Sequence, residues 1–251
     1  MTNHTSSHID ITKHGGVLTL RMNRPDKKNA LTADMYAAMA DAMVAADADR
    51  AVGALVFLGL PGVFSAGNDL KDFAAFAARG TLGQEVLSFL RALAIFEKPL
   101  LAAVDGLAVG VGTTLLMHCD YVLVSERATL STPFVNLALV PEAASSLLAP
   151  RIMGHGKAFE LLVMGRSFNA EQAVASGLAN TVVGSDTIEA AAIAAAKELA
   201  GKPQEAVKIS RRLMKGSPDE ILQRIDDEAV LFAERLRSKE AQKAFMAFLS
   251  K

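Results

Sequence analysis

The chain has 251 residues, of which 51% are hydrophobic, and its 26 basic and 27 acidic residues leave a net charge of −1. The length allows one large domain or two small ones, and the balanced charge gives no broad basic surface of the kind that attracts nucleic acid. The single cysteine, Cys119, excludes an internal disulfide framework and fits a reducing compartment. We expect no membrane span and no signal peptide, because no apolar run is long enough.

Residues 1–14 are polar, and we expect them to form a disordered start. The two histidines within residues 1–8, at positions 4 and 8, are too sparse for a metal site, and no metal site is predicted. Residues 17–22 alternate between apolar and polar side chains, which predicts a half-exposed strand. Turn-forming residues follow over 23–29, and Thr32 is placed to cap a helix that runs to about residue 48.

The next apolar run, residues 52–59, predicts a strand that is buried on both faces. After it, residues 63–70 form a bend, and Asp69 and Asp72 are spaced as acids at a helix start. Gly67 allows the backbone to turn sharply and a ligand to come close. Amide N–H groups at such a helix start have no partner within the helix, so they can point at an anion.

A second stretch repeats this design at residues 100–116, where an apolar strand precedes a glycine-rich bend and a helix. Gly80 and Gly83 interrupt the largely helical residues 71–97. Further elements are expected in chain order as a strand at 121–124, a helix over 141–164, a strand at 178–183 and helices from 186 to the end. Strands that alternate with helices indicate an α/β core, and the helical tail indicates a separate layer.

The two bends place free amides at Asn68 and near Val111. Two converging N–H donors are what a developing oxyanion requires. The glycines around Val111 do not match a nucleotide-binding loop, since no Gly-Lys-Ser/Thr follows them and the third glycine of a dinucleotide fingerprint is missing.

Several motifs together resemble the crotonase superfamily, also called the enoyl-CoA hydratase/isomerase family. They are Asn23-Arg24-Pro25 with Asn29-Ala30-Leu31, Phe64 to Leu70, Lys98 to Gly106, Cys119-Asp120, Gly165, Ala173 to Leu178, and the tail from Glu228 to Phe248. The resemblance covers nearly the whole chain from Leu18 onward. It implies an α/β fold with a β-β-α spiral core over residues 15–198 and a helical trimerisation region over 199–251. It also implies trimers or dimers of trimers.

The resemblance further implies that the protein binds acyl-CoA thioesters and stabilises an enolate. Coenzyme A is then part of the substrate, and no separate cofactor is expected. By position, the amides of Asn68 and Val111 form the oxyanion hole. The family usually has glycine at position 111, so we expect the Val111 side chain to narrow the acyl tunnel. The residues expected to bind acyl-CoA are Lys28, Ala30, Ala66, Gly67, Asn68, Asp69, Leu70, Val111, Phe134 and Leu137.

A typical hydratase of the family carries two glutamates, at the positions where this chain has Thr114 and Phe134. Instead, Glu142 follows Pro141 in a stretch that resembles the peroxisomal-type Δ3,Δ2-enoyl-CoA isomerases, in which this glutamate is the catalytic base. One carboxylate can take a proton from C2 and return it at C4. We expect an apolar pocket that includes Phe134 and Leu137 to raise its proton affinity. Without the resemblance, Glu142 reads more simply as a surface acid near a helix start.

Alternatives remain open at this point. A hydratase or another crotonase reaction is one, and a non-catalytic acyl-CoA-binding protein is another. Ser65 and Ser145 suggest a hydrolase only weakly, because no histidine lies in a recognisable triad motif and His118 sits on an apolar helix. A basic helix face at Lys208, Arg211, Arg212 and Lys215 is typical of a solvated surface, although part of it could meet a CoA phosphate. The C-terminal sequence is not a recognisable peroxisomal signal, so we expect a cytoplasmic protein.

Overall fold

The computed structural model describes residues 6–79 and 81–249 of the chain, which contain two sheets. The larger sheet has the strand order β1 (Ile9–His14), β2 (Val17–Met22), β3 (Ala54–Leu58), β5 (Leu100–Val104), β7 (Tyr121–Ser125) and β10 (Thr181–Val183). The smaller sheet has the order β4 (Val63–Ser65), β6 (Leu107–Val109), β8 (Thr129–Ser131) and β9 (Phe168–Asn169). Neighbouring strands are parallel except for the pairs β1–β2 and β8–β9.

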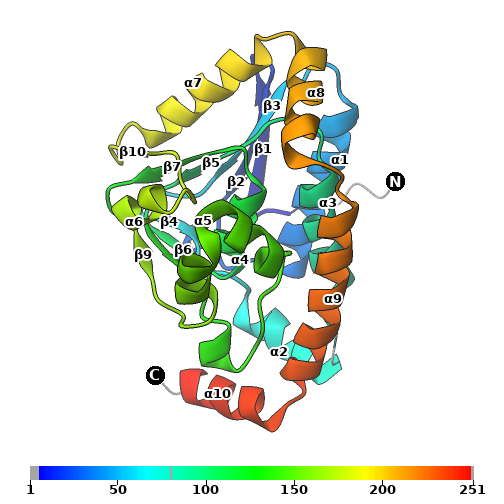
Figure 1. The fold of residues 1–251 in the computed structure, drawn as a ribbon, viewed down its shortest axis with the longest axis vertical. Coiled ribbons are helices and arrows are strands. Elements are labelled where there is room, and N and C mark those ends of the chain that lie inside the picture. The colour runs from blue at the N-terminus through cyan, green and yellow to red at the C-terminus, as the bar shows by residue number, and fades with distance from the viewer. Residues whose placement is uncertain (1–5, 80, 250–251) are drawn as a thin grey trace.

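The two central strands β3 and β5 are buried along their whole length, as their unbroken apolar sequences predict. One face of the sheet packs against α7 (Ile188–Ala200), while the other face packs in the main core with α1 (Ala33–Ala48) and α3 (Gln84–Ile95). Figure 1 shows α7 on one side of the sheet and α1 and α3 on the opposite side. Burial of both faces therefore explains why these strands lack alternating polar residues.

The chain repeats one unit three times: a strand of the larger sheet, a strand of the smaller sheet, and then a helical segment. The first repeat is β3, β4 and α2 (Leu70–Arg79), and the second is β5, β6 and α4 (Val111–Thr114). The third is β7, β8 and η3 (Val135–Leu137), a single helical turn. This is the β-β-α spiral that the family resemblance implies. Because β4 and β6 are parallel neighbours, the bends that follow them lie at the same edge of the smaller sheet.

The remaining helices are η1 (Pro25–Lys27), η2 (Leu115–His118), α5 (Ser145–Leu162), α6 (Ala170–Ala175), α8 (Gln204–Lys215), α9 (Asp219–Leu236) and α10 (Lys239–Leu249). Helices α8 and α9 follow one another along one side of the molecule, and α10 lies at the end remote from α7 (Figure 1). The C-terminal layer is therefore helical, as expected. In the part of the chain that the structure describes, no helix has the length and apolar character needed to cross a membrane.

Three local predictions are corrected. The expected disordered start is wrong for residues 9–14, which form β1 and pair with β2 from Ile9 opposite Met22 to His14 opposite Val17. Only Ile9 of β1 is buried, so backbone pairing rather than burial holds this strand. Residues 1–5 lie outside the described residues. The strand expected at 178–183 is limited to β10, and the helix expected from residue 141 begins only at Ser145. The division of the chain at residue 198 stays a prediction.

Candidate active site

The first bend carries the amide of Asn68 on a backbone held by the loop before α1. The Leu31 N–H donates to the Gly67 carbonyl at 2.7 Å, and the Leu31 carbonyl accepts from the Asp69 N–H at 2.8 Å. Because these bonds come from the residues on either side, the N–H of Asn68 itself faces away from Leu31. Gly67 has a φ of 89°, and an added Cβ would meet the Val109 carbonyl oxygen at 3.0 Å. Glycine therefore lets the two bends approach closely.

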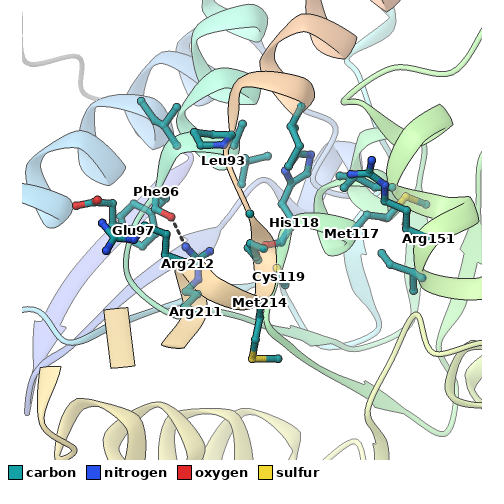
Figure 2. Close-up of a pocket in the computed structure, with 18 of the residues that line it drawn as sticks. Leu93, Phe96, Glu97, Met117, His118, Cys119, Arg151, Arg211, Arg212 and Met214 are labelled. Atoms are coloured by element: carbon teal, nitrogen blue, oxygen red, sulfur yellow. Dashed lines mark hydrogen bonds between the residues drawn. The ribbon is translucent and has the colours of Figure 1, made fainter. Parts of the chain in front are cut away.

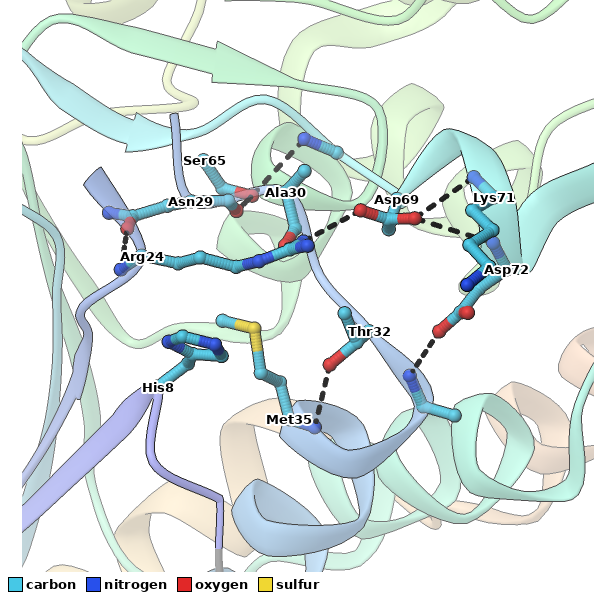
Figure 3. A network of polar contacts seen from close by, with 12 residues as sticks. His8, Arg24, Asn29, Ala30, Thr32, Met35, Ser65, Asp69, Lys71 and Asp72 are labelled. Atoms are coloured by element: carbon cyan, nitrogen blue, oxygen red, sulfur yellow. Dashed lines mark hydrogen bonds and ion pairs between the residues drawn. The ribbon is translucent and has the colours of Figure 1, made fainter. Parts of the chain in front are cut away.

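A polar network fixes this first bend, as Figure 3 shows. Arg24 donates from Nη1 to Asp69 at 2.7 Å and to the Ala30 carbonyl at 2.9 Å. The other carboxylate oxygen of Asp69 accepts from the Lys71 N–H at 2.9 Å, which caps α2 as predicted. Burial acts to raise the pKa of Asp69, but the hydrogen bonds from Arg24 and the Lys71 N–H outweigh it and lower this pKa below its usual value. Asp69 is thus a charged anchor of the bend.

The second bend places Val111 as the first residue of α4, where its N–H has no acceptor within the helix. Gly110 precedes it with a φ of 56° and a ψ of −120°. The Gly110 N–H donates to the Ser131 carbonyl at 2.8 Å, while its carbonyl accepts from the N–H of Thr113 and of Thr114. The Val111 side chain is buried in the main core. Val109 and Gly110 line the adjacent cavity, whereas Val111 is not among its lining residues, and a narrowing of the acyl tunnel by Val111 stays a prediction.

A cavity of about 670 Å³ lies between the two bends and the C-terminal helices. This volume falls in the range of small-molecule sites, and the lining is mostly apolar. Helices α9 and α10 contribute Phe232 and Phe245 to it. Six of the residues expected to bind acyl-CoA line this cavity: Ala66, Gly67, Asn68, Leu70, Phe134 and Leu137. The sequence therefore identified part of this pocket's lining, from two separate stretches of the chain, 66–70 and 134–137.

Three of the other residues expected to bind acyl-CoA, Lys28, Ala30 and Asp69, make contacts that hold the first bend. Lys28 is exposed, and its carbonyl accepts from the Ala66 N–H at 2.9 Å. Lys28 and Asn29 both have positive φ, which shapes the loop that faces the first bend. The Ala30 carbonyl and the Asp69 carboxylate both accept hydrogen bonds from the guanidinium of Arg24. These residues hold the first bend through backbone and ionic contacts.

Glu142 is almost completely covered, with 4% of its surface exposed. Thr114, one turn after the second bend, donates its hydroxyl to Oε1 of Glu142 at 2.6 Å. Burial raises the pKa of Glu142 to about 7, helped by the nearby negative charge of Glu228 and opposed by the hydrogen bond from Thr114. A carboxyl group with this pKa can both accept and donate a proton near neutral pH. The interpretation of Glu142 as a solvated surface acid is therefore wrong.

Tyr36, on α1, links the first bend to the surroundings of Glu142. Its hydroxyl donates to Oδ1 of Asn68 at 2.6 Å. Burial and the negative charge of Glu142 raise the pKa of Tyr36 well above its usual value, so the phenol stays protonated. Neither this contact nor that of Thr114 with Glu142 was foreseen. The sequence predicts only the helix that carries Tyr36.

Glu142 precedes two residues with left-handed backbone, Ala143 with a φ of 61° and Ala144 with a φ of 55°. Such a conformation costs a non-glycine residue about 1–2 kcal/mol. His118 donates from Nε2 to the Ala143 carbonyl at 2.8 Å. Burial lowers the pKa of His118 to about 4, so the imidazole is neutral and serves as a structural donor, as the sequence indicates. The turn is built from alanines, so its shape depends on such outside contacts.

The serine and histidine side chains that could suggest a hydrolase are not arranged as a catalytic triad. The Ser65 hydroxyl donates to the Asn29 carbonyl at 2.9 Å and accepts from the Gly67 N–H at 3.1 Å. The Ser145 hydroxyl is buried and has no hydrogen-bond partner among the described residues. His118 is occupied by the Ala143 carbonyl. Burial also raises the pKa of the Cys119 thiol to about 12, so it is no thiolate nucleophile.

The basic face of α8 adjoins another cavity, of about 340 Å³, shown in Figure 2. Most of its cations already have partners. Arg211 bonds to Asp120 at 2.6 Å and to the Phe96 carbonyl, and Lys215 bonds to Asp120 at 3.1 Å. Lys208 pairs with Glu97. These contacts tie α8 to the core, so the basic face is mainly structural. Across residues 6–79 and 81–249, no cluster of three or more His, Cys, Asp or Glu side chains is placed to hold a metal ion.

Comparison with known proteins agrees with this architecture. The enoyl-CoA hydratase/isomerase family matches residues 12–251. The chain belongs to the enoyl-CoA hydratase/isomerase family, and its crotonase fold is the one that the sequence motifs imply. The solved structure of OdaA from Pseudomonas aeruginosa superposes with a TM-score of 0.93 and 45% identity, and the match covers 98% of this chain and 100% of that chain.

Two curated relatives carry different activities in their names. The chain is 36% identical over 252 residues to enoyl-CoA delta isomerase 2 from Rattus norvegicus, which covers 98% of this chain and 64% of the rat protein. The chain thus spans less than two thirds of that relative's length. It is also 31% identical to a probable enoyl-CoA hydratase from Rhizobium meliloti (strain 1021), over 96% of this chain and 94% of that protein. The particular reaction must therefore be argued from the site.

Proposed function

We propose that the protein is a Δ3,Δ2-enoyl-CoA isomerase that uses Glu142 as its only proton shuttle. The observation that carries this proposal is the buried carboxyl group of Glu142, which is hydrogen-bonded to Thr114 of α4 and has a pKa of about 7. Thr114 and Phe134 stand where a typical hydratase has its two glutamates. Without that pair, the usual activation of a water molecule is missing. The likeness to the rat isomerase supports the same assignment, and the substrate class belongs to fatty acid metabolism.

The proposed reaction balances with one group. Glu142 takes a proton from C2, the C–H electron pair forms a C1–C2 double bond, and the thioester oxygen becomes negative. The N–H groups of Asn68 and Val111 donate to this oxygen, each stabilising the dienolate by about 3 kcal/mol. Glu142 then returns the proton to C4, where the C3–C4 π electrons of the substrate form the new C–H bond. The C1–C2 pair moves to C2–C3, and the carbonyl re-forms.

The assay compares isomerisation of a 3-enoyl-CoA with hydration of a 2-enoyl-CoA. We expect isomerisation to dominate and its kcat/KM to rise through a pH of about 7, because Glu142 must be ionised to accept the C2 proton. Glu142→Gln should lower turnover by roughly 10²–10⁴-fold with nearly unchanged acyl-CoA affinity. Glu160→Gln, which changes a glutamate paired with Lys157 on the surface, is the matched control.

Other outcomes point to the alternatives. Hydration well above isomerisation would make the protein a hydratase despite its missing carboxylates. Acyl-CoA binding without turnover, unaffected by Glu142→Gln, would indicate a non-catalytic binding protein. Full isomerase activity in Glu142→Gln would place the base elsewhere.

We further propose that the protein assembles as a homotrimer or a dimer of trimers. Part of the apolar C-terminal surface covers the chain's own core, since Ile221, Ile225 and Phe232 are buried. A second set on the C-terminal helices is exposed, which supports an interface: Leu213, Met214, Val230, Leu231 and Met246.

A further inference from the structure

A second buried acid, Glu228, reaches from α9 to the segment that follows Glu142. One of its carboxylate oxygens accepts from the Ala144 N–H at 2.6 Å, and the other accepts from the Ser146 N–H at 3.0 Å. Only 5% of Glu228 is exposed. Both carboxylate oxygens are therefore engaged by backbone donors within four residues of the proposed catalytic base.

The segment that Glu228 holds needs an outside partner. Ala143 and Ala144 both adopt left-handed backbone, and the first N–H groups of α5 have no acceptors within the helix. The N-cap residue is Ala144, whose side chain has no atom that could accept a hydrogen bond from these N–H groups. Glu228 takes over this capping role from a different helix, 84 residues away in sequence.

The same face of α9 also reaches the substrate cavity. Arg224, Glu228 and Phe232 are spaced four residues apart, which places them on one side of the helix. Arg224 donates from Nη1 to the Ser146 hydroxyl at 3.0 Å. Phe232 lines the cavity of about 670 Å³. Helix α9 thus contacts the catalytic turn and the pocket wall through one row of side chains.

We propose that Glu228 is a positioning residue that holds the Glu142 carboxylate in its reactive place by fixing the Ala143–Ala144 turn. This inference rests on the proposed role of Glu142 as proton shuttle. In this arrangement the C-terminal helical layer supports the proton transfer as well as covering the core.

Glu228 also acts on Glu142 through its charge. Its negative charge opposes ionisation of Glu142 and so contributes to the raised pKa of that group. Polar groups near the turn include Thr114 from α4, Tyr36 from α1 and neutral His118 from η2, together with the hydroxyls of Ser145 and Ser146. Burial raises the pKa of Glu228 itself, while the hydrogen bonds from Ser146 and Ala144 and the charge of Arg224 on the same helix favour its ionised form. Loss of the charge of Glu228 should therefore lower the pKa of Glu142.

Two variants separate geometry from charge. Glu228→Gln keeps the side-chain length but loses the charge. Its NH₂ group cannot accept a hydrogen bond, so either the Ala144 or the Ser146 N–H loses its acceptor. We expect kcat to fall about tenfold or more with a nearly constant KM, and the acid limb of kcat/KM to move down by roughly half a pH unit or more. Glu228→Asp keeps the charge but shortens the reach. It should lower kcat and leave the acid limb in place.

The control is Asp226→Asn on the same helix, where the exposed acid pairs with Arg91. It should leave kcat and the pH profile unchanged. Isomerisation is measured from pH 5 to 9 together with thermal unfolding for every variant. Should Glu228→Gln not fold, Glu228→Asp alone tests the inference through kcat.

Glu142→Gln separates the two levels of the proposal. If Glu142→Gln abolishes turnover while both Glu228 variants keep the wild-type kcat and pH profile, the positioning role is wrong and Glu228 is a structural cap only. A lower melting temperature of the Glu228 variants with unchanged kinetics also means that Glu228 is a structural cap only. If Glu142→Gln retains activity, the proposed function itself has failed.

Discussion

Burial of Glu142 affects the stability of the fold as well as the chemistry. The carboxyl group is raised from its ordinary pKa of 4.5 to about 7, with burial as the largest cause. Its folded form therefore binds a proton more tightly than its unfolded form. Between these two pKa values, stability falls as the pH rises, and above about 7 the full penalty, on the order of 3 kcal/mol, is present. A reactive base thus weakens the native state at the pH where it works.

Glu142→Gln should consequently stabilise the protein at pH 8 by about 1–3 kcal/mol and much less at pH 5, since the amide never ionises but still accepts from Thr114. Thermal unfolding at the two pH values measures the difference. Glu160→Gln is the control, because hydrogen bonding to Lys157 lowers the pKa of Glu160 and its loss should bring no gain at high pH. Equal melting temperatures of Glu142→Gln and wild type at pH 8 would contradict the burial argument.

At the scale of elements, the site depends on two bends that leave neighbouring strands at one sheet edge. The first bend is pinned to the loop before α1 by the Arg24–Asp69 ion pair, whose side chains are both largely buried. Asp69 also caps α2. A single carboxylate therefore sets both the start of a helix and the position of the adjacent Asn68 amide.

Asp69→Ala should lower stability by about 2 kcal/mol, because it removes a helix cap and leaves Arg24 without its partner in a largely buried place. It should also reduce kcat by roughly tenfold to a hundredfold, since displacement of the Asn68 N–H weakens contact with the developing oxyanion. Unfolding and steady-state kinetics give the two numbers. Asp26→Ala changes an exposed acid in η1 and should alter neither. Normal kcat in Asp69→Ala would separate the ion pair from the chemistry.

Local signals account for the elements that the sequence predicts. The buried strands β3 and β5 have unbroken apolar runs, Thr32 caps α1, and Gly67 marks the first bend. Strand β1 was missed because only one of its side chains is buried and backbone pairing holds it. The delayed start of α5 was missed because alanine does not signal left-handed backbone.

Contacts between distant segments lie beyond such signals. Tyr36 meets Asn68 across 32 residues, and Ala144 meets Glu228 across 84. No local sequence pattern indicates either contact, because the packing of α1 and α9 against the spiral brings these residues together. Glu142 itself was found through its place in a family motif. Its burial and raised pKa follow from the packed fold.

At the scale of the whole molecule, the exposed apolar side chains of the C-terminal helices need an explanation. Leu213 and Met214 at the end of α8 are 80% and 88% exposed, and Met246 on α10 is 71% exposed. Exposed apolar residues gathered on one layer typically mark an interface between protein chains. Because closed symmetric assemblies bury such surfaces on every copy, the proposed homo-oligomer would cover them.

Light scattering at micromolar concentration should therefore give a mass of three or six times the 26.5 kDa chain. The double variant Leu213→Glu/Met214→Glu places charges on the proposed interface and should shift the population toward smaller species, because burying unpaired carboxylates is unfavourable. Ile11→Glu, on the exposed side of β1, is the matched control and should keep the assembly intact. A monomeric wild-type protein would refute the trimer and leave the apolar helices as a surface for a different partner.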